Sequence, residues 1–293
     1  MRTGRATDGA RPSLIVSADD FGLSVEVNEA VEDAHRRGFL STASLMVAGP
    51  AAADAVRRAR ALPGLGVGLH LVVVEGDAVL PDSSPGGVFS GDQLALALQY
   101  FFQPAARRRL GREIAAQYRA FAATGLRLDH ANAHKHMHLH PTVGRLLIEI
   151  GRAHGLRAIR VPAEPPSLLS ACGDVPSTSA RALYTWASLL RWQARREGLL
   201  TNDWTLGLAW TGHVTAERVR RAIPHFPPGL GELYLHPATA KTARLETLMP
   251  DYEHERELAL LTDLSLWKEL SERATLRGWS AAGAHTPLSG HPD

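Results

Sequence analysis

Histidines alternate with other residues along one short stretch of this chain. Five of its 14 histidines stand at every second position between His130 and His140, and only Asn132 interrupts the alternation. Alternate side chains of an extended strand point to the same face, so we expect a histidine strand with all five imidazoles on one side. Imidazole is the commonest protein ligand for metals and titrates near neutral pH. The stretch therefore predicts metal binding or proton transfer, and the alternative is a polar strand whose imidazoles only exchange hydrogen bonds.

Two adjacent carboxylates, Asp19 and Asp20, follow the short apolar run at 14–18. Adjacent carboxylates repel each other, so a position at the end of a buried strand is unfavourable unless a cation or a proton donor compensates. The structural alternative is a helix N-cap. Ser24 stands in the better position to cap the following helix, so we interpret the aspartate pair as functional.

His70 lies in the apolar sequence 66–71, in which two glycines leave room for close approach. A single histidine in an apolar strand is usually a core residue whose nitrogens are satisfied by neighbours. The aspartate pair and the histidine stretch make it a ligand candidate, because one carboxylate and two imidazoles leave positions open on a divalent ion. Water and substrate take such positions in hydrolytic metal sites.

These residues must be positioned by elements that alternate along the chain. The predicted strands cover 14–18, 42–47, 67–74, the histidine stretch, 158–162, 204–210 and 231–236, and the predicted helices cover 25–37, 51–62, 92–123, 142–154, 184–196, 216–223 and 253–274. Such alternation predicts a parallel sheet. The candidate residues end different strands, and no Gly-x-Gly-x-x-Gly follows the first strand. We therefore predict a TIM-barrel-like β/α barrel of about seven parallel strands rather than a doubly wound sheet. The barrel domain is expected over 13–275, with flexible tails at 1–12 and 279–293.

The composition argues against several classes of protein. The net charge is only +2, and the arginines are scattered over predicted helices, which does not indicate a nucleic-acid partner. Cys172 is the only cysteine, so an intrachain disulfide is excluded. The first residues lack the apolar core of a signal peptide, and no apolar run approaches the ~20 residues of a membrane span. We expect a cytoplasmic protein, and the sequence is compatible with contact between this protein and a membrane surface.

Five short motifs occur in the order found in a known family. They lie at 17–22, at 68–71, in the His-x-His-x-His run that ends at Pro141, at 159–162 and at 232–237. Together they resemble the YdjC-like carbohydrate deacetylases, also called the chitooligosaccharide deacetylase family, over residues 13–265. The sequences at 43–50 and 132–136 look more like the branch associated with hopanoid biosynthesis. The resemblance implies a β/α barrel that removes acetyl groups from N-acetylated amino sugars with a divalent metal ion, Mg²⁺ or Zn²⁺.

The resemblance also implies roles for the candidate residues. Asp20, His70 and His134 match metal ligands, and Asp19 matches the base that activates the attacking water. His236 is the candidate acid that protonates the leaving amine, with Glu232 or another strand-end group orienting it. The residues expected to support the metal or the substrate are Arg160, His136, His138, Glu232 and Asn132.

Three of these expectations come with a reservation or an alternative. His136 is the alternative to His134 as the metal ligand. A structural ion pair is the alternative for Arg160, which would otherwise anchor a sugar hydroxyl or steady a carboxylate. Asn132 stands where many family members carry an acidic residue, which bears on metal affinity or metal preference. His130 is expected to be structural, and His140 is expected to open the next helix.

The leading functional interpretation is a hydrolase that removes the N-acetyl group from an N-acetylglucosamine-type sugar, with a hopanoid glycolipid as a candidate substrate. A lipid-linked substrate would fit the apolar residues at 98–102, which follow a long loop at 75–91, and the apolar stripe at 186–192. Packing of these helices on the barrel is the alternative for both. The competing functions are a metal-dependent phosphoesterase or amidohydrolase, which typically carries His-x-His on its first strand, and a sugar-binding barrel without turnover. The expected partner is an N-acetylated sugar or glycolipid, and no nucleic acid is expected. The sequence does not decide whether the protein forms a homodimer.

Overall fold

A computed structural model describes residues 11–283 of the chain. Eight strands follow one another in a curled sheet, in the order β8-β7-β6-β3-β2-β1-β10-β9, and β11 pairs separately with β1. The strands are β1 (Ser13–Phe21), β2 (Thr42–Leu45), β3 (Gly66–Leu71), β6 (Leu128–Ala133), β7 (Ala158–Ile159), β8 (Leu200–Thr201), β9 (Trp204–Leu206), β10 (Leu230–Leu235) and β11 (Thr275–Leu276). Neighbouring strands of this sheet pair in parallel, so their carboxyl ends share one rim. The predicted parallel β/α barrel is confirmed.

β9, at one end of the sheet, is joined to the segment after β7 without a regular strand ladder. Thr205 N, in β9, donates a hydrogen bond to Ala163 O, just beyond β7, over 3.0 Å. The side chain of Asn202 bonds both main-chain groups of Val161, accepting from N at 2.7 Å and donating to O at 2.9 Å. The barrel is therefore closed here by single hydrogen bonds rather than by strand pairing.

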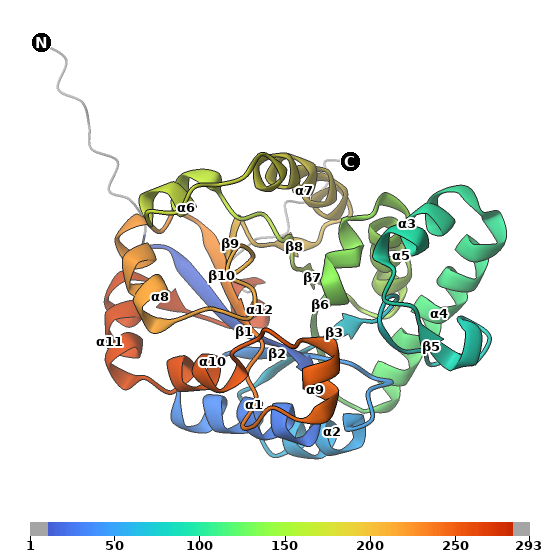
Figure 1. Cartoon of the computed structure of the whole chain (residues 1–293), viewed down its shortest axis with the longest axis horizontal. Helices are drawn as coiled ribbons and strands as arrows, with labels where there is room; N and C mark the ends of the chain where they lie inside the picture. The colour runs from blue at the N-terminus through green and yellow to red at the C-terminus, as the bar shows by residue number, and fades with distance from the viewer. Residues whose placement is uncertain (1–10, 284–293) are drawn as a thin grey trace, which may run out of the picture.

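Helices surround the curled sheet on its outside (Figure 1). They are α1 (Val25–Arg37), α2 (Ala52–Arg60), α3 (Gln93–Phe102), α4 (Pro104–Ala123), α5 (Pro141–Ala153), α6 (Pro166–Ala171), α7 (Thr178–Arg196), α8 (Ala216–Ala222), α9 (Ala243–Leu248), α10 (His254–Leu261), α11 (Leu264–Arg273) and α12 (Trp279–Gly283). Ser24 caps α1 as expected, since its Oγ accepts a hydrogen bond from Val27 N.

Two of the predicted helices are each divided in two. The helix expected over 92–123 breaks before Pro104, which opens α4 because its ring cannot continue the preceding helix. The helix expected over 253–274 breaks at Asp263, whose side chain caps α11 by accepting from the main-chain N of residues 265 and 266.

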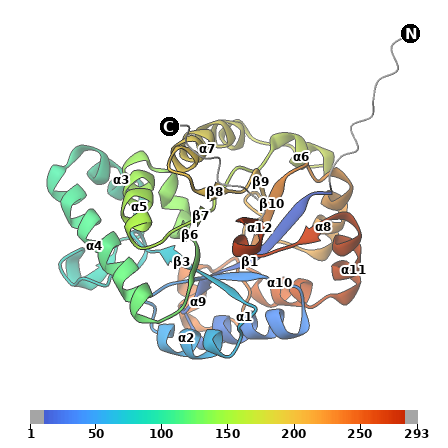
Figure 2. The ribbon, with the colours of Figure 1, turned by 180° about the vertical axis from the view of Figure 1, so that it is seen from behind.

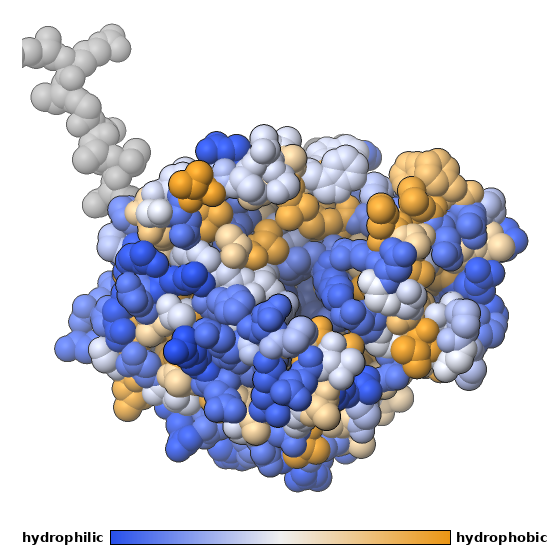
Figure 3. All heavy atoms as spheres, viewed as in Figure 1, coloured by the Kyte–Doolittle hydropathy of each residue, from blue (hydrophilic) through white to orange (hydrophobic). Residues whose placement is uncertain are grey.

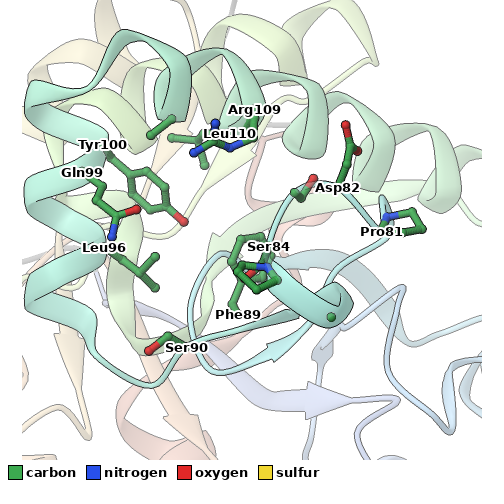
Figure 4. Close-up of a pocket in the computed structure, with 14 residues that line it drawn as sticks. Pro81, Asp82, Ser84, Phe89, Ser90, Leu96, Gln99, Tyr100, Arg109 and Leu110 are labelled. Atoms are coloured by element: carbon green, nitrogen blue, oxygen red, sulfur yellow. The ribbon is translucent and has the colours of Figure 1, made fainter.

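The segment 75–93, which we call the insertion, forms a small hairpin where a long loop was expected over 75–91. Its strands, β4 (Gly76–Asp77) and β5 (Val88–Phe89), pair antiparallel, and the 3-10 turn η1 (Pro85–Gly87) lies between them. With α3 and α4 it makes the arm at the right of Figure 1. A cavity of about 570 Å³ lies between the hairpin and these helices and is lined by Phe89, Leu96 and Tyr100 among others (Figure 4). None of the predicted site residues lines it.

The predicted histidine strand is wrong beyond residue 133. β6 ends at Ala133, and His134–Leu139 form a 3-10 turn, η2. Lys135 and His136 adopt left-handed backbone, with φ of 48° and 54°. This conformation costs an ordinary residue roughly 1–2 kcal/mol, and the alternation of residue types does not reveal it. The imidazoles therefore point to different neighbours instead of lining one strand face.

The helix α12 closes the amino-terminal end of the barrel, as seen from behind in Figure 2. Its Trp279 is buried in a cluster with Ile15, Ala158 and Leu230. The indole ring also stacks on His130, with ring centroids 5.5 Å apart. The predicted tails at 1–12 and 279–293 lie largely outside the described residues, but residues 279–283 form this helix.

Candidate active site

Three of the predicted ligands converge at the carboxyl ends of β1, β3 and β6. Asp20 Oδ1 lies 3.2 Å from His70 Nε2 and 3.3 Å from His134 Nδ1, and the two imidazole nitrogens are 3.4 Å apart. All three residues are buried, and their ligand atoms lie within 4.8 Å of one another. Within the described chain, neither carboxylate oxygen of Asp20 has a hydrogen-bond donor in suitable geometry. Because buried carboxylate oxygens need a compensating partner, the group fits a divalent metal ion.

Both adjacent aspartates lie in a β-bulge at the end of β1. The register between β1 and β2 shifts between Ala18 and Phe21, and Asp20 has a left-handed backbone with φ of 63°. A bulge redirects side chains at the end of a strand. Asp20 thereby lies beside the imidazoles of His70 and His134. Asp19 instead contacts Asn132 and Arg160. Neither aspartate caps α1.

Asn132 connects Asp19 to His70. Its Nδ2 donates hydrogen bonds to Asp19 Oδ1 at 3.1 Å and to Ser44 Oγ at 3.0 Å. Because a carboxylate only accepts, the amide must turn its oxygen toward His70 Nδ1, 2.7 Å away. That nitrogen therefore carries the proton, and His70 Nε2 presents its lone pair to Asp20. Pairing of β3 with β6 places His70 directly opposite Asn132.

Arg160 is fully buried between two carboxylates. One terminal nitrogen donates to Asp19 Oδ2, while Nε and the other terminal nitrogen donate to Glu232 Oε1 at 3.0 and 2.9 Å. Ser17 Oγ donates to the same Glu232 oxygen. Burial raises the pKa of Asp19, but the charge of Arg160 and its hydrogen bond outweigh burial and hold this pKa well below its ordinary range. Asp19 is therefore an ionised, oriented carboxylate.

His136 and His138 leave η2 toward the interior. His136 Nε2 lies 3.1 Å from Tyr234 OH, which also contacts Thr211 Oγ1 at 2.9 Å. His138 Nε2 donates to Arg160 O over 3.0 Å. Burial lowers the pKa of both imidazoles, to about 3 for His138. Both rings are therefore neutral near pH 7 and act as hydrogen-bonding groups rather than charges.

His236 follows β10 and is held through its main chain. Its N donates to Glu257 Oε2, and its O accepts from His254 Nδ1. The ring lies between Tyr234 and Tyr252, with centroid distances of 5.7 and 5.2 Å. Burial lowers the pKa of His236, and the charges of Asp20 and Asp19 offset only part of this effect.

The orientation of His236 differs from expectation in one respect. Glu232 contacts Arg160 and Ser17, and among the described residues no hydrogen bond joins it to His236. Sequence reasoning missed Glu257, which fixes the main chain of His236 instead. A signal existed: Glu257 lies on the buried stripe of α10 with Leu260 and Leu261, an unfavourable place for a carboxylate that has no partner.

The family model described as YdjC-like protein matches residues 13–272, a span that contains every residue of this site. The chain belongs to the YdjC-like family. A relative from Geobacillus stearothermophilus named carbohydrate deacetylase is 29% identical over 263 residues, which cover 88% of this chain and 93% of that protein. Proteins of the same name from Brevibacillus brevis and Vibrio cholerae are 36% and 33% identical over shorter stretches, 53% and 48% of this chain. These stretches span only 60% and 56% of the two relatives.

A solved structure supports the fold of this YdjC-like chain. A protein from Enterococcus faecalis V583, proposed to cleave cellobiose phosphate, superimposes with a TM-score of 0.72 at 20% sequence identity. The superposition covers 93% of this chain and 99% of that protein. At this level of identity the similarity establishes the shared fold.

Proposed function

We propose that this YdjC-like protein is a metal-dependent hydrolase that removes the N-acetyl group from an N-acetylglucosamine-type sugar. One observation carries the proposal: an ionised carboxylate, Asp19, is adjacent in the chain to a ligand group made by Asp20, His70 and His134. The relative from Geobacillus stearothermophilus, which aligns over nearly its whole length and is named carbohydrate deacetylase, supports this activity.

The roles of the residues follow from the chemistry of amide hydrolysis. An amide is a poor electrophile with a poor leaving group, so it needs a polarised carbonyl, an activated water and a proton donor. A divalent cation held by Asp20, His70 and His134 would polarise the carbonyl and lower the pKa of water. Asp19 takes the proton of the attacking water. Two imidazoles in the ligand set favour Zn²⁺ over Mg²⁺, which prefers oxygen ligands.

His236 is the proposed donor to the leaving amine. Because burial lowers the pKa of its imidazole, His236 is largely neutral near pH 7 and must receive a proton during the reaction. The proton that Asp19 takes from water is the available source. Glu257 and His254 fix the main chain of His236 and leave its ring free to meet the substrate.

A substrate panel separates this function from the alternatives. The zinc-loaded protein should release acetate from N-acetylated sugars and no phosphate from phosphomonoesters. Phosphate release without acetate release would favour the phosphoesterase alternative. Sugar binding without release of acetate would favour a non-catalytic barrel.

We further propose that the sugar is linked to a lipid, such as a hopanoid, and that the protein contacts the membrane surface peripherally. One stripe of α3 exposes large apolar side chains: Leu94 is 71% exposed, Leu98 50%, Phe101 51% and Phe102 68%. Trp186, Leu189 and Trp192 are exposed on α7, whereas Tyr100 and Leu190 pack inward. Hydrophobic residues gather over α3 at the upper right of Figure 3, beside the hollow in the middle of that face.

Both stripes adjoin the end of η2, at Leu139 and His140. The ring of Phe101 lies 5.9 Å from that of His140, and Trp186 Nε1 donates to Leu139 O over 2.8 Å. Exposed aromatic and aliphatic side chains next to a site are typical of contact with apolar ligands or lipid surfaces. None of the described helices combines the length and apolarity needed to cross a bilayer.

A matched pair of double variants tests the lipid-linked substrate. Phe101→Ser with Phe102→Ser should lower kcat/KM for an N-acetylglucosaminyl hopanoid and leave kcat/KM for a soluble chitooligosaccharide unchanged. Leu264→Ser with Trp267→Ser is the control, because these exposed residues lie on α11. An equal effect of both double variants on the lipid substrate contradicts the proposal. Light scattering of the protein without lipid distinguishes membrane contact from formation of a homodimer.

A further inference from the structure

Both ends of the insertion contact Lys135, the second residue of η2. At its start, Glu75 forms an ion pair with Lys135 Nζ. At its end, Gln93 Nε2 donates a hydrogen bond to Lys135 O over 3.0 Å. Gly91 leaves the space that the Glu75 carboxylate occupies, since a Cβ at this position would lie 2.8 Å from Glu75 Oε1. The insertion therefore holds both the side chain and the main chain of one residue in η2.

These contacts fall on a strained part of the backbone. Lys135 and His136 are consecutive left-handed residues, and Glu75 itself has φ of 44°. η2 contains no glycine that would adopt this conformation without strain. Non-glycine residues keep such a backbone only where surrounding contacts over-determine it. Glu75 Oε2 is shielded from solvent, whereas the Lys135 side chain is 34% exposed, so water screens the ion pair only in part.

We propose that Glu75 and Lys135 form a clamp that orients the metal-ligating turn, an inference that rests on the proposed metal site. Lys135 lies between His134, whose Nδ1 is 3.3 Å from Asp20, and His136, whose Nε2 is 3.1 Å from Tyr234 OH. A change of backbone angles at Lys135 rotates these two imidazoles relative to each other. The clamp thereby keeps His134 aimed at the metal group while His136 faces the barrel interior. Lys135 is a positioning residue, and its effect is on the affinity of the site for metal.

Three variants and one control separate the effects of the Glu75 charge, the Lys135 side chain and the backbone conformation of Lys135. Glu75→Gln keeps the shape of the partner and removes its charge, and Lys135→Ala removes the cation. Lys135→Gly also removes the cation but favours the left-handed backbone. Arg112→Ala is the matched control, because Arg112 pairs with Asp82 of the same insertion over 2.7 Å, from α4.

The experiment uses the full chain in two measurements. Co²⁺ is titrated into metal-depleted protein and followed by visible absorption, and amide hydrogen exchange of residues 133–140 is measured in chelator. Glu75→Gln and Lys135→Ala should weaken Co²⁺ binding about tenfold or more and speed exchange in this segment. Lys135→Gly should recover part of the affinity, and Arg112→Ala should match the parent.

Two results would each overturn a different claim. Parent-like affinity and exchange in both Glu75→Gln and Lys135→Ala overturn the clamp. A parent protein that binds no Co²⁺ contradicts the metal site, and exchange in chelator then decides the clamp alone: unchanged exchange overturns it and faster exchange supports it.

Discussion

Asn132 donates a hydrogen bond to Asp19 over 3.1 Å, so the proposed base is oriented by the residue that also fixes the tautomer of His70. Base and metal ligand lie at the ends of different strands, β1 and β3, and this one amide from β6 joins them. A change at position 132 can therefore act on the metal ligand His70, on Asp19, or on both.

Substitution of Asn132 should separate these two effects. Asn132→Ala removes the acceptor for His70 Nδ1 and should weaken metal affinity by about 10- to 100-fold. Asn132→Asp keeps that acceptor but replaces the donor to Asp19 with a carboxylate, so it should retain metal and lower turnover. The loss of turnover should be partial, because many family members carry an acidic residue at this position. Metal affinity and acetate release measure the two effects. Asn202→Ala is the control, since Asn202 joins β7 to β9 instead. Metal affinity that is unchanged in Asn132→Ala would contradict the role assigned to this amide.

The adjacent aspartates should respond differently to the same substitution. Asp19→Asn should lower acetate release by about 10²- to 10⁴-fold, the range for loss of a general base, and keep bound metal. Asp20→Asn should lose both metal and turnover, because it removes the one carboxylate of the ligand group. Metal content is read by elemental analysis beside the rate. Normal turnover by Asp19→Asn would rule out its role as the base.

Loss of Arg160 should destabilise the protein strongly. Arg160→Met leaves Asp19 and Glu232 buried without their shared cation, and breaking a buried pair costs about 3–5 kcal/mol. Arg145→Ala breaks the exposed pair with Glu149 and should cost less than about 1 kcal/mol. Urea unfolding of the two variants gives the comparison. Similar losses in both would show that the buried charges are stabilised by other groups.

Stability should depend on the protonation of Glu164. Burial raises the pKa of Glu164 from 4.5 to about 7, although the backbone N–H groups of residues 207–209 donate to its carboxylate. The folded state therefore binds this proton more tightly than the unfolded state does. The resulting stability is present below about pH 4.5 and is lost as the pH rises through about 7, with a size of roughly 3 kcal/mol. Glu164→Gln should flatten this part of the pH dependence in urea unfolding, and an unchanged slope would contradict the assignment.

The barrel and the ligand candidates could be predicted because they depend on local patterns. Apolar runs ending in polar residues indicate strands, and strands of a parallel barrel bring their carboxyl ends to one rim. This reasoning brought Asp20, His70 and His134 together, although they are far apart in the chain. The left-handed backbone at Lys135 could not be predicted, because alternating histidines fit a strand equally well and the contacts of Lys135 come from Glu75 and Gln93, which are distant in the chain.

Polar contacts between residues that are far apart in the chain could not be predicted from the sequence either. The ion pairs of Arg160 depend on strand register, and the left-handed backbone of Asp20 lies in a local irregularity of β1. Trp279 resembled part of a polar tail, yet it is buried at the amino-terminal end of the barrel. Its partners, Ile15 and Leu230, belong to β1 and β10, so no local sequence pattern predicts the contact.

The most direct test of metal-dependent deacetylation is acetate release by the metal-depleted protein as Zn²⁺ is added back. We expect no release from an N-acetylated sugar before addition, a linear rise with added zinc, and a plateau at about one ion per chain, the occupancy of a single three-ligand site. Full acetate release from the metal-depleted protein, or no release at any zinc content, would contradict this expectation.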